Sequence, residues 1–141
     1  MSMSTHLDIV SLDEEIYCGR AERVFLTGTL GDLEVAPGHA PLLTELMPGP
    51  VRIRKLGGAI EVVYVSGGLL EVQPEVVTVL ADTVVRAKDL DEAEALQKKA
   101  DAKRSLDSHQ SDVDYARVRA ELIRAVAMLR AIRHARQYHS K

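Results

Sequence analysis

The stretch VYVSGGLLEVQPEVVTVLADT, running from Val63 to Thr83, decides the fold class of this 141-residue chain. Its runs of β-branched residues are broken by a glycine pair and by a proline, which are turn signals. The nearly continuous apolar runs 59–65 and 76–85 are typical of strands that are covered on both sides. Short strands and turns continue back to Thr5, with turn signals roughly 8 to 10 residues apart, which predicts a β-sandwich or barrel.

Two other segments alternate strictly between apolar and polar residues. VRIRK places Val51 and Ile53 on one face of a strand, and DLEV does the same with Leu33 and Val35. Such strands have one face in the core and the other toward solvent. No helical period interrupts the strands before Arg86, which argues against a parallel βαβ architecture.

The spacing of the apolar residues changes to that of a helix at Asp89. DLDE predicts Asp89 as the N-cap of this helix, with Glu92 three residues on as in a capping box. The helix is expected to end near Arg104. Its predicted apolar face consists of Ala93, Leu96 and Ala100.

A second start signal, from Ser111 to Asp114, precedes a longer helical segment. Because the linker is short, the two helices are expected to be antiparallel neighbours. The chain is therefore predicted to be a β + α protein, with a β-sandwich domain at 1–87 and a helix-loop-helix domain at 88–141. The apolar side predicted for the second helix consists of Tyr115, Val118, Leu122, Val126, Leu129 and Ile132.

The helical segment is basic and only lightly apolar. Residues 1–88 contain 7 Lys and Arg against 12 Asp and Glu, whereas residues 111–141 contain 7 against 3. A basic segment indicates an acidic partner, either a protein surface or a nucleic acid, but the absence of Trp and the single Phe disfavour nucleic acid. Because few large apolar residues offset the ordering cost, the hairpin is expected to rearrange between folding on itself, lying on the sandwich and docking on a partner.

The composition is that of a soluble protein with a single core. The chain is 46% hydrophobic and 28% charged, and it has neither a run of about 18 apolar residues nor a signal segment. It is therefore expected to stay in the cytoplasm. Cys18 is the single cysteine, so no internal disulfide is possible, and it is expected to be a buried structural residue rather than a nucleophile.

His39 is the first residue that a search for chemistry would single out. It lies between Pro37-Gly38 and Pro41, without a Cys, carboxylate or second His at metal or catalytic spacing. The prolines predict a rigid surface loop that is presented to a partner. His134 and His139 are five residues apart, which is poor spacing for one helical face, and a solvated position is expected for both. No catalytic, metal or cofactor site is predicted from the residues.

Four segments together resemble the epsilon subunit family of bacterial F-type ATP synthases, over essentially the whole chain. They are HLDIVS at 6–11, GDLEVAPGHAPLLT at 31–44, the stretch quoted first, and DLDEA at 89–93. The resemblance implies a ten-stranded β-sandwich with a C-terminal antiparallel hairpin, in a non-catalytic subunit of the central rotor stalk that couples proton flow to ATP synthesis. It also implies that the hairpin restrains ATP hydrolysis.

The resemblance further implies partners and a location. The expected partners are the gamma subunit, the ring of c subunits and, when the hairpin is extended, the alpha and beta subunits of the catalytic head. The expected location is the cytoplasmic face of the bacterial plasma membrane, reached only through the complex. The implied contact with the c ring consists of Gly31, Asp32, Pro37, Gly38, His39, Ala40 and Pro41. The implied contacts with the catalytic head consist of Arg117, Arg124, Arg130 and Arg133.

One position departs from the family pattern. Epsilon subunits that bind ATP in the folded hairpin resemble an acidic-x-x-Arg pattern at the start of the first helix, and Glu94 stands where that arginine is expected. An anion in place of a phosphate-pairing cation predicts that regulatory ATP does not bind. Two alternatives remain open from the residues: a stand-alone adaptor whose basic helix binds acidic protein or RNA, and a small enzyme that uses His39.

Overall fold

The computed structural model describes residues 4–108 and 112–139. Ser111, part of the predicted start signal, lies outside these ranges. The strands are β1 (Thr5–Val10), β2 (Glu15–Gly28), β3 (Gly31–Val35), β4 (Leu42–Leu46), β5 (Gly49–Lys55), β6 (Ile60–Val65), β7 (Gly68–Val72), β8 (Val76–Ala81) and β9 (Val84–Arg86). The helical elements are the 3-10 turn η1 (Ala87–Asp89), α1 (Glu92–Asp107) and α2 (Asp112–His139).

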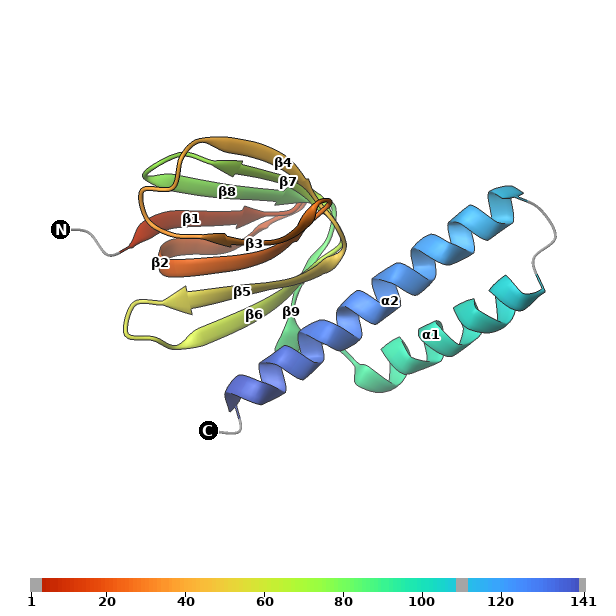
Figure 1. Cartoon of the computed structure of the whole chain (residues 1–141). Helices are drawn as coiled ribbons and strands as arrows, with labels where there is room; N and C mark the ends of the chain where they lie inside the picture. Colours follow the sequence, from red (N-terminus) through yellow and green to blue (C-terminus); the bar gives the residue numbers. More distant parts are fainter. Residues whose placement is uncertain (1–3, 109–111, 140–141) are drawn as a thin grey trace.

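Strand β2 belongs to both layers of the predicted β-sandwich. Its first part pairs with β1 and its second part with β3 and β5, and the register against β5 shifts between Ala21 and Arg23. One layer holds β1, β8, β7, β4 and the start of β2, and the other holds the rest of β2 with β3, β5, β6 and β9 (Figure 1). The described residues thus form nine strands, and counting β2 once in each layer gives the ten that the resemblance implied.

The two layers enclose one apolar core. Val51 and Ile53 are fully buried in it and Val35 lies beside them, with Leu33 packed against the edge, as the alternating patterns predicted. Each of these strands turns its other face outward. The alternation of the sequence therefore fixes which face of each strand forms the core.

Two strands with similar apolar runs differ in how they are covered. Strand β6 is buried on both sides, as predicted, because Val63 faces the core while Val62 and Tyr64 lie beneath the hairpin. The same prediction is wrong for β8, where Val76 and Leu80 are exposed. The reason is the position of the hairpin, which lies across β5 and β6 and leaves the outer face of β8 open (Figure 1).

The first helix begins three residues after the predicted N-cap. Asp89 ends the 3-10 turn, and Asp91 is the N-cap, its carboxylate accepting a hydrogen bond from the Glu94 backbone N–H at 3.2 Å. DLDE offers two aspartates for this role, and the 3-10 turn moves the start to the second one. The helix ends at Asp107 rather than near Arg104.

The hairpin is antiparallel, as predicted, but its contact faces are lined by alanines. In α1 the buried residues are Ala95 and Ala102, whereas Leu96 of the predicted apolar face is 49% exposed. In α2, Val126 and Tyr115 of the predicted face are exposed too. Since α2 packs against α1 and the sandwich on different sides, small residues at both contacts replace a single stripe of large ones. The buried residues of α2 are Ala125, Ala127, Ala131 and Ile132.

Candidate partner-binding surfaces

The second half of α2 docks on the outer face of β5 and β6. Ala127 and Ala131 pack on Val62 and Tyr64 in a small apolar cluster that is separate from the main core. Alanines bring the helix close to the sheet but contribute little apolar area each. This contact, here called the docking interface, is therefore narrow, and its partly buried members are Ile60, Val85, Leu90, Met128, Ala135 and Tyr138.

Polar contacts border the docking interface. The Arg52 guanidinium lies 4.8 Å from the centre of the Phe25 ring and donates a hydrogen bond to the Tyr138 hydroxyl at 3.2 Å. Arg136 of α2 also forms an ion pair with Glu92 at the start of α1. The sequence did not predict these contacts, because they join residues that are 27 to 86 positions apart.

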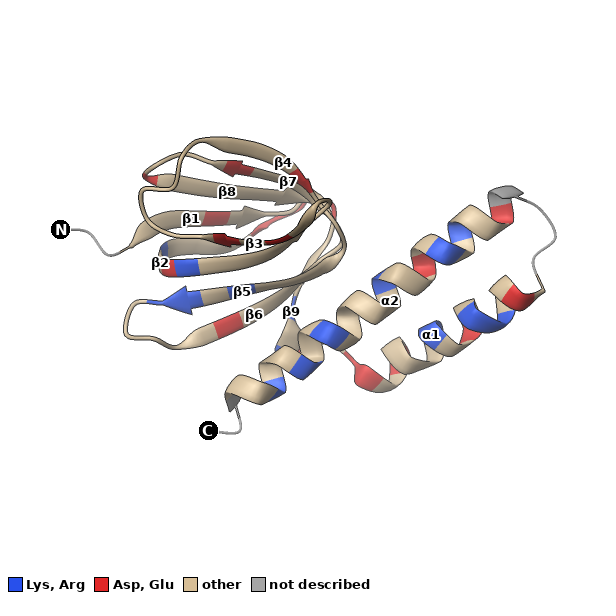
Figure 2. Ribbon diagram, in the orientation of Figure 1, with Lys and Arg blue, Asp and Glu red and all other residues tan. Residues whose placement is uncertain are grey.

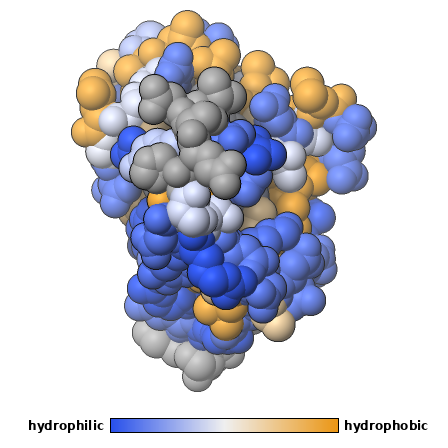
Figure 3. Space-filling view, turned by 90° about the vertical axis from the view of Figure 1, so that its right-hand side faces the viewer, coloured by the Kyte–Doolittle hydropathy of each residue, from blue (hydrophilic) through white to orange (hydrophobic). Residues whose placement is uncertain are grey.

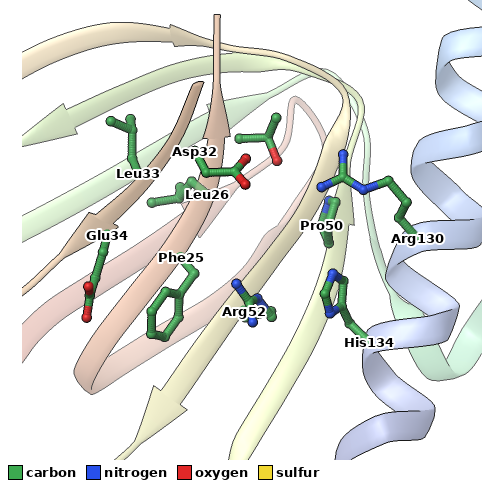
Figure 4. Close-up of a pocket in the computed structure, with 10 residues that line it drawn as sticks. Phe25, Leu26, Asp32, Leu33, Glu34, Pro50, Arg52, Arg130 and His134 are labelled. Carbon is green, nitrogen blue, oxygen red and sulfur yellow. The ribbon is translucent and has the colours of Figure 1, made fainter. Parts of the chain in front are cut away.

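A pocket of about 320 Å³ lies between α2 and the strands next to the docking interface. Figure 4 shows Arg130 and His134 reaching into it from α2, with Arg52 on β5 and Asp32 on β3. The sequence predicted a solvated His134, but this side chain is partly buried and its Nδ1 has no hydrogen-bond partner. The side chain of His139 lies outside the described ones.

The surroundings of His134 favour its neutral form. Burial lowers the pKa of its imidazole first, and the guanidinium groups of Arg52, Arg130 and Arg133 lower it further, while Asp32 acts in the opposite direction. A neutral imidazole among arginines avoids repulsion in a partly desolvated site. We therefore expect docking of the hairpin to depend on the protonation of His134.

The residues implied for c-ring contact lie at two opposite ends of the sandwich. Gly28, Leu46, Gly68 and Ala81 are paired in series across the sheet, and each is the first or last residue of its strand, so the turns next to them share one end. Gly31 and Asp32 follow the first of these turns. Strand β3 then crosses the sheet, with a length of about 16 Å at 3.3 Å per residue, before the loop at 36–41 begins at the other end.

The loop at 36–41 contacts a second loop. Gly38 N–H donates to the Pro74 carbonyl at 3.1 Å, and His39 N–H donates to the Ala36 carbonyl at the same distance. The His39 ring donates through Nδ1 to the Ala40 carbonyl at 2.7 Å. These bonds hold the loop in one conformation, and the ring is presented at the surface of that end.

Two apolar surfaces of the sandwich are exposed. Leu30 and Leu12 are 100% and 81% exposed at the end that carries Asp32. On the outer face of β4, β7 and β8, Leu43, Leu69 and Leu80 are 67%, 44% and 51% exposed, and Leu69 is paired directly with Leu80. We call these last three residues the outer-face patch. Figure 3, which looks along the hairpin, shows apolar residues gathered over the sandwich and hydrophilic ones over the helices.

The four arginines implied for the catalytic head do not share one face of the docked hairpin. Arg117 is exposed and lies 3.8 Å from Asp114, and Arg133 is exposed near the C-terminal end. Arg124 lines the groove between the two helices, and Arg130 points into the pocket beside Asp32. Figure 2 shows basic residues distributed along the whole length of α2. Only a rearranged hairpin would free all four.

No described helix is both long enough and apolar enough to span a bilayer.

The family model for the ATP synthase Delta/Epsilon chain beta-sandwich domain matches residues 4–87. The model for the ATP synthase Delta/Epsilon chain long alpha-helix domain matches residues 88–133.

Curated relatives match over the full length. The ATP synthase epsilon chain of Legionella pneumophila (strain Corby) is 54% identical over 137 residues, which is 97% of this chain and 98% of that protein. The ATP synthase epsilon chain of Chromohalobacter salexigens is 53% identical over 138 residues, or 98% of each chain.

Two solved assemblies contain chains with the same fold. A chain of the Euglena gracilis mitochondrial ATP synthase, solved as OSCP/F1/c-ring, superposes with a TM-score of 0.85 at 19% identity, covering 94% of this chain and 83% of that one. A chain of the Tetrahymena thermophila mitochondrial ATP synthase central stalk/c-ring gives a TM-score of 0.62 at 14% identity, with coverages of 91% and 96%.

Proposed function

The chain belongs to the ATP synthase delta/epsilon family, and on this premise we propose that it connects the neighbouring rotor subunits and restrains ATP hydrolysis through its hairpin. Its role is that of a rotor subunit of the ATP synthase, and the full-length match favours this role over a stand-alone adaptor. We propose that it catalyses no reaction of its own and that it is held at the cytoplasmic face of the plasma membrane by the complex.

The contact with the c ring is assigned to one end of the sandwich only. The turn that leads into Gly31 and Asp32 carries the fully exposed Leu30, and Leu12 is exposed at the same end. Strand β3 separates this turn from the loop at 36–41, which lies at the other end of the sandwich. We therefore assign the Asp32 end to the c ring and the His39 loop to another neighbouring subunit.

The gamma subunit is assigned to the outer-face patch. Leu43, Leu69 and Leu80 lie on strands whose opposite faces fill the core, and they stay exposed because the hairpin packs against β5 and β6 instead. An exposed apolar group on a rigid sheet is typical of a protein contact. Glu71 is paired with Leu43 and Glu45 with Leu69, so two carboxylates lie directly beside the leucines of the patch.

The regulatory role rests on the narrow docking interface, which is the observation that carries the proposal. Only the second half of α2 docks on the sandwich, and it does so largely through alanines. A contact of this size is within reach of a competing partner, since moving a two-state equilibrium from 1:99 to 99:1 takes roughly 5.5 kcal/mol. In the extended state, Arg124 and Arg130 would leave the groove and the pocket and become free to meet acidic surfaces of the head.

Deletion of residues 89–141 tests the proposal. The truncated chain retains every strand of the sandwich, so the complex should assemble and synthesise ATP, while the rate of ATP hydrolysis rises. Unchanged hydrolysis would remove the regulatory role and leave the connecting role. Failure of the complex to couple proton flow to synthesis would place an essential contact in the hairpin.

A further inference from the structure

Three residues with metal-binding side chains meet on the outer face of β1 and β2. His6 and Asp8 are two residues apart in β1, so both project from the same face, and Asp8 is paired with Cys18 of β2. The sequence did not reveal this group, because Cys18 is 10 residues from Asp8 and 12 residues from His6. The predicted buried position of Cys18 is wrong, since the thiol is exposed.

The distances within this group suit a first-row metal ion. His6 Nε2 lies 2.9 Å from Asp8 Oδ1 and 3.7 Å from Cys18 Sγ, and the three ligand atoms all lie within 4.8 Å of one another. Tetrahedral Zn²⁺, with bonds of about 2.0–2.3 Å, holds such atoms about 3.3–3.6 Å apart. Small side-chain rotations are therefore enough to bring all three onto one ion, with no movement of the paired strands.

We propose that His6, Asp8 and Cys18 form a Zn²⁺ site on the surface of the sandwich. Imidazole, carboxylate and thiolate are the ligand types that zinc takes in proteins, and the thiolate disfavours Mg²⁺ and Ca²⁺. Three protein ligands leave the fourth position of the tetrahedron to water or to a group from a neighbouring subunit. The bound ion joins β1 to β2 and stabilises the start of the chain.

The charges around Cys18 favour the ion. The Asp8 carboxylate lies within 4.8 Å of the thiol, and the carboxylate of Glu15 adds a second negative charge nearby. Carboxylates that disfavour a bare thiolate favour a divalent cation at the same place. Zinc binding therefore displaces the thiol proton: the Sγ–H bond breaks, the Sγ–Zn bond forms, and one proton is released to the buffer.

Titration of the full-length, chelator-stripped chain with Co²⁺ tests this proposal. One equivalent should produce a sulfur-to-cobalt charge-transfer band together with the strong visible bands of tetrahedral Co²⁺, and Zn²⁺ should remove both by competition. Calorimetry with Zn²⁺ in buffers of different ionisation enthalpy should show 1:1 binding with release of about one proton near pH 7.

Variants identify the ligands. Cys18→Ser should abolish the charge-transfer band, and both Cys18→Ser and His6→Gln should weaken Zn²⁺ binding at least tenfold. Asp13→Asn changes an exposed carboxylate of the neighbouring loop and should bind like the unchanged chain. Unfolding curves of the metal-free proteins show whether each variant is folded. The proposal is overturned if no charge-transfer band appears, or if Zn²⁺ binds Cys18→Ser as tightly as the unchanged chain.

Discussion

Arg136 near the end of α2 forms an ion pair with Glu92 at the start of α1, so the two helices are fastened together where the hairpin meets the sandwich. The side chains are 68% and 36% exposed. Solvent screening therefore limits what the pair contributes to the free energy of docking, to about 1 kcal/mol or less. The ion pair therefore acts mainly by fixing how α1 and α2 lie against each other in the closed hairpin.

Charge reversal at this pair gives the first prediction. Arg136→Glu should raise amide hydrogen exchange throughout α1 by no more than about fivefold, because a loss of about 1 kcal/mol corresponds to that factor. The double variant Glu92→Arg/Arg136→Glu should restore most of the protection. An unchanged exchange rate in the single variant would show that the pair contributes nothing to closure.

The docking interface should not tolerate a larger side chain. Ala131 is fully buried between α2 and the sheet, so Ala131→Leu forces the helix away and should cost about 1–3 kcal/mol of docking free energy. The hairpin should then leave the sandwich more often. In the isolated chain, this change is measured as faster amide hydrogen exchange at β6 and α2.

A matched substitution on the same helix separates packing from helix propensity. Val126 is 36% exposed and lies outside the docking interface, so Val126→Leu should change the docking free energy by less than about 0.5 kcal/mol. Equal effects of the two substitutions would mean that the alanine contact does not hold the hairpin.

Docking should depend on pH through His134. The pKa of this side chain is lowered from its ordinary value of 6.5 by burial and then by Arg52, Arg130 and Arg133, against the opposing effect of Asp32. A lowered pKa means that the docked state binds its proton more weakly than the released state does. The contribution to docking is therefore fully present above pH 6.5, and it is lost as the pH falls below that value and through the lowered pKa of the docked state.

Exchange-protection profiles recorded between about pH 5 and 8 check this dependence. Hairpin protection should fall on the acid side in the unchanged chain and should lose this trend in His134→Gln. His39→Gln replaces a histidine whose hydrogen bonds stay within its own loop and should keep the trend. If hairpin protection still falls on the acid side in His134→Gln, then another titratable group causes the pH dependence.

Comparison of β6 and β8 shows where the sequence stops being informative. Both strands have apolar residues on both faces, and the pattern correctly predicts that β6 is covered on both sides. It does not say which strand the hairpin covers, because the hairpin binds through alanines whose spacing is hidden among larger residues. Leu80 is exposed because the hairpin covers the outer face of β6 and not that of β8.

The positions of the candidate sites depend even more on contacts between residues that are far apart in the sequence. The loop prediction joined His39 to Asp32 as one contact, whereas the length of β3 separates the two residues. The cluster of His6, Asp8 and Cys18 depends on the register of β1 against β2, which no spacing rule supplies. Local patterns thus predict strands and turns, whereas sites formed across strands require the topology.

Regulatory ATP should not bind to the hairpin of this chain. Glu94 lies in the first turn of α1, where the family resemblance places a phosphate-pairing arginine, and it forms an ion pair with Lys98 at 3.0 Å. A carboxylate at this position repels phosphate and also engages the nearest lysine. Calorimetry with the isolated chain should detect no micromolar ATP binding, and Glu94→Arg should bind ATP more tightly than the unchanged chain does. Micromolar binding by the unchanged chain would contradict the prediction.

The outer-face patch gives the last prediction, since Leu80 is central to the assignment of the gamma subunit. It is 51% exposed and is paired with Leu69, so Leu80→Glu places a charge inside the patch without disturbing the core behind it. The free energy of unfolding of the isolated chain should change by less than about 1 kcal/mol, because both states leave the side chain in water. Assembly with gamma should weaken at least tenfold, since the carboxylate would have to be desolvated in the interface.

Leu96→Glu is the matched control, because Leu96 is 49% exposed on α1, away from the patch, and the variant should assemble normally. Equal assembly of the two variants would mean that gamma binds elsewhere on the sandwich.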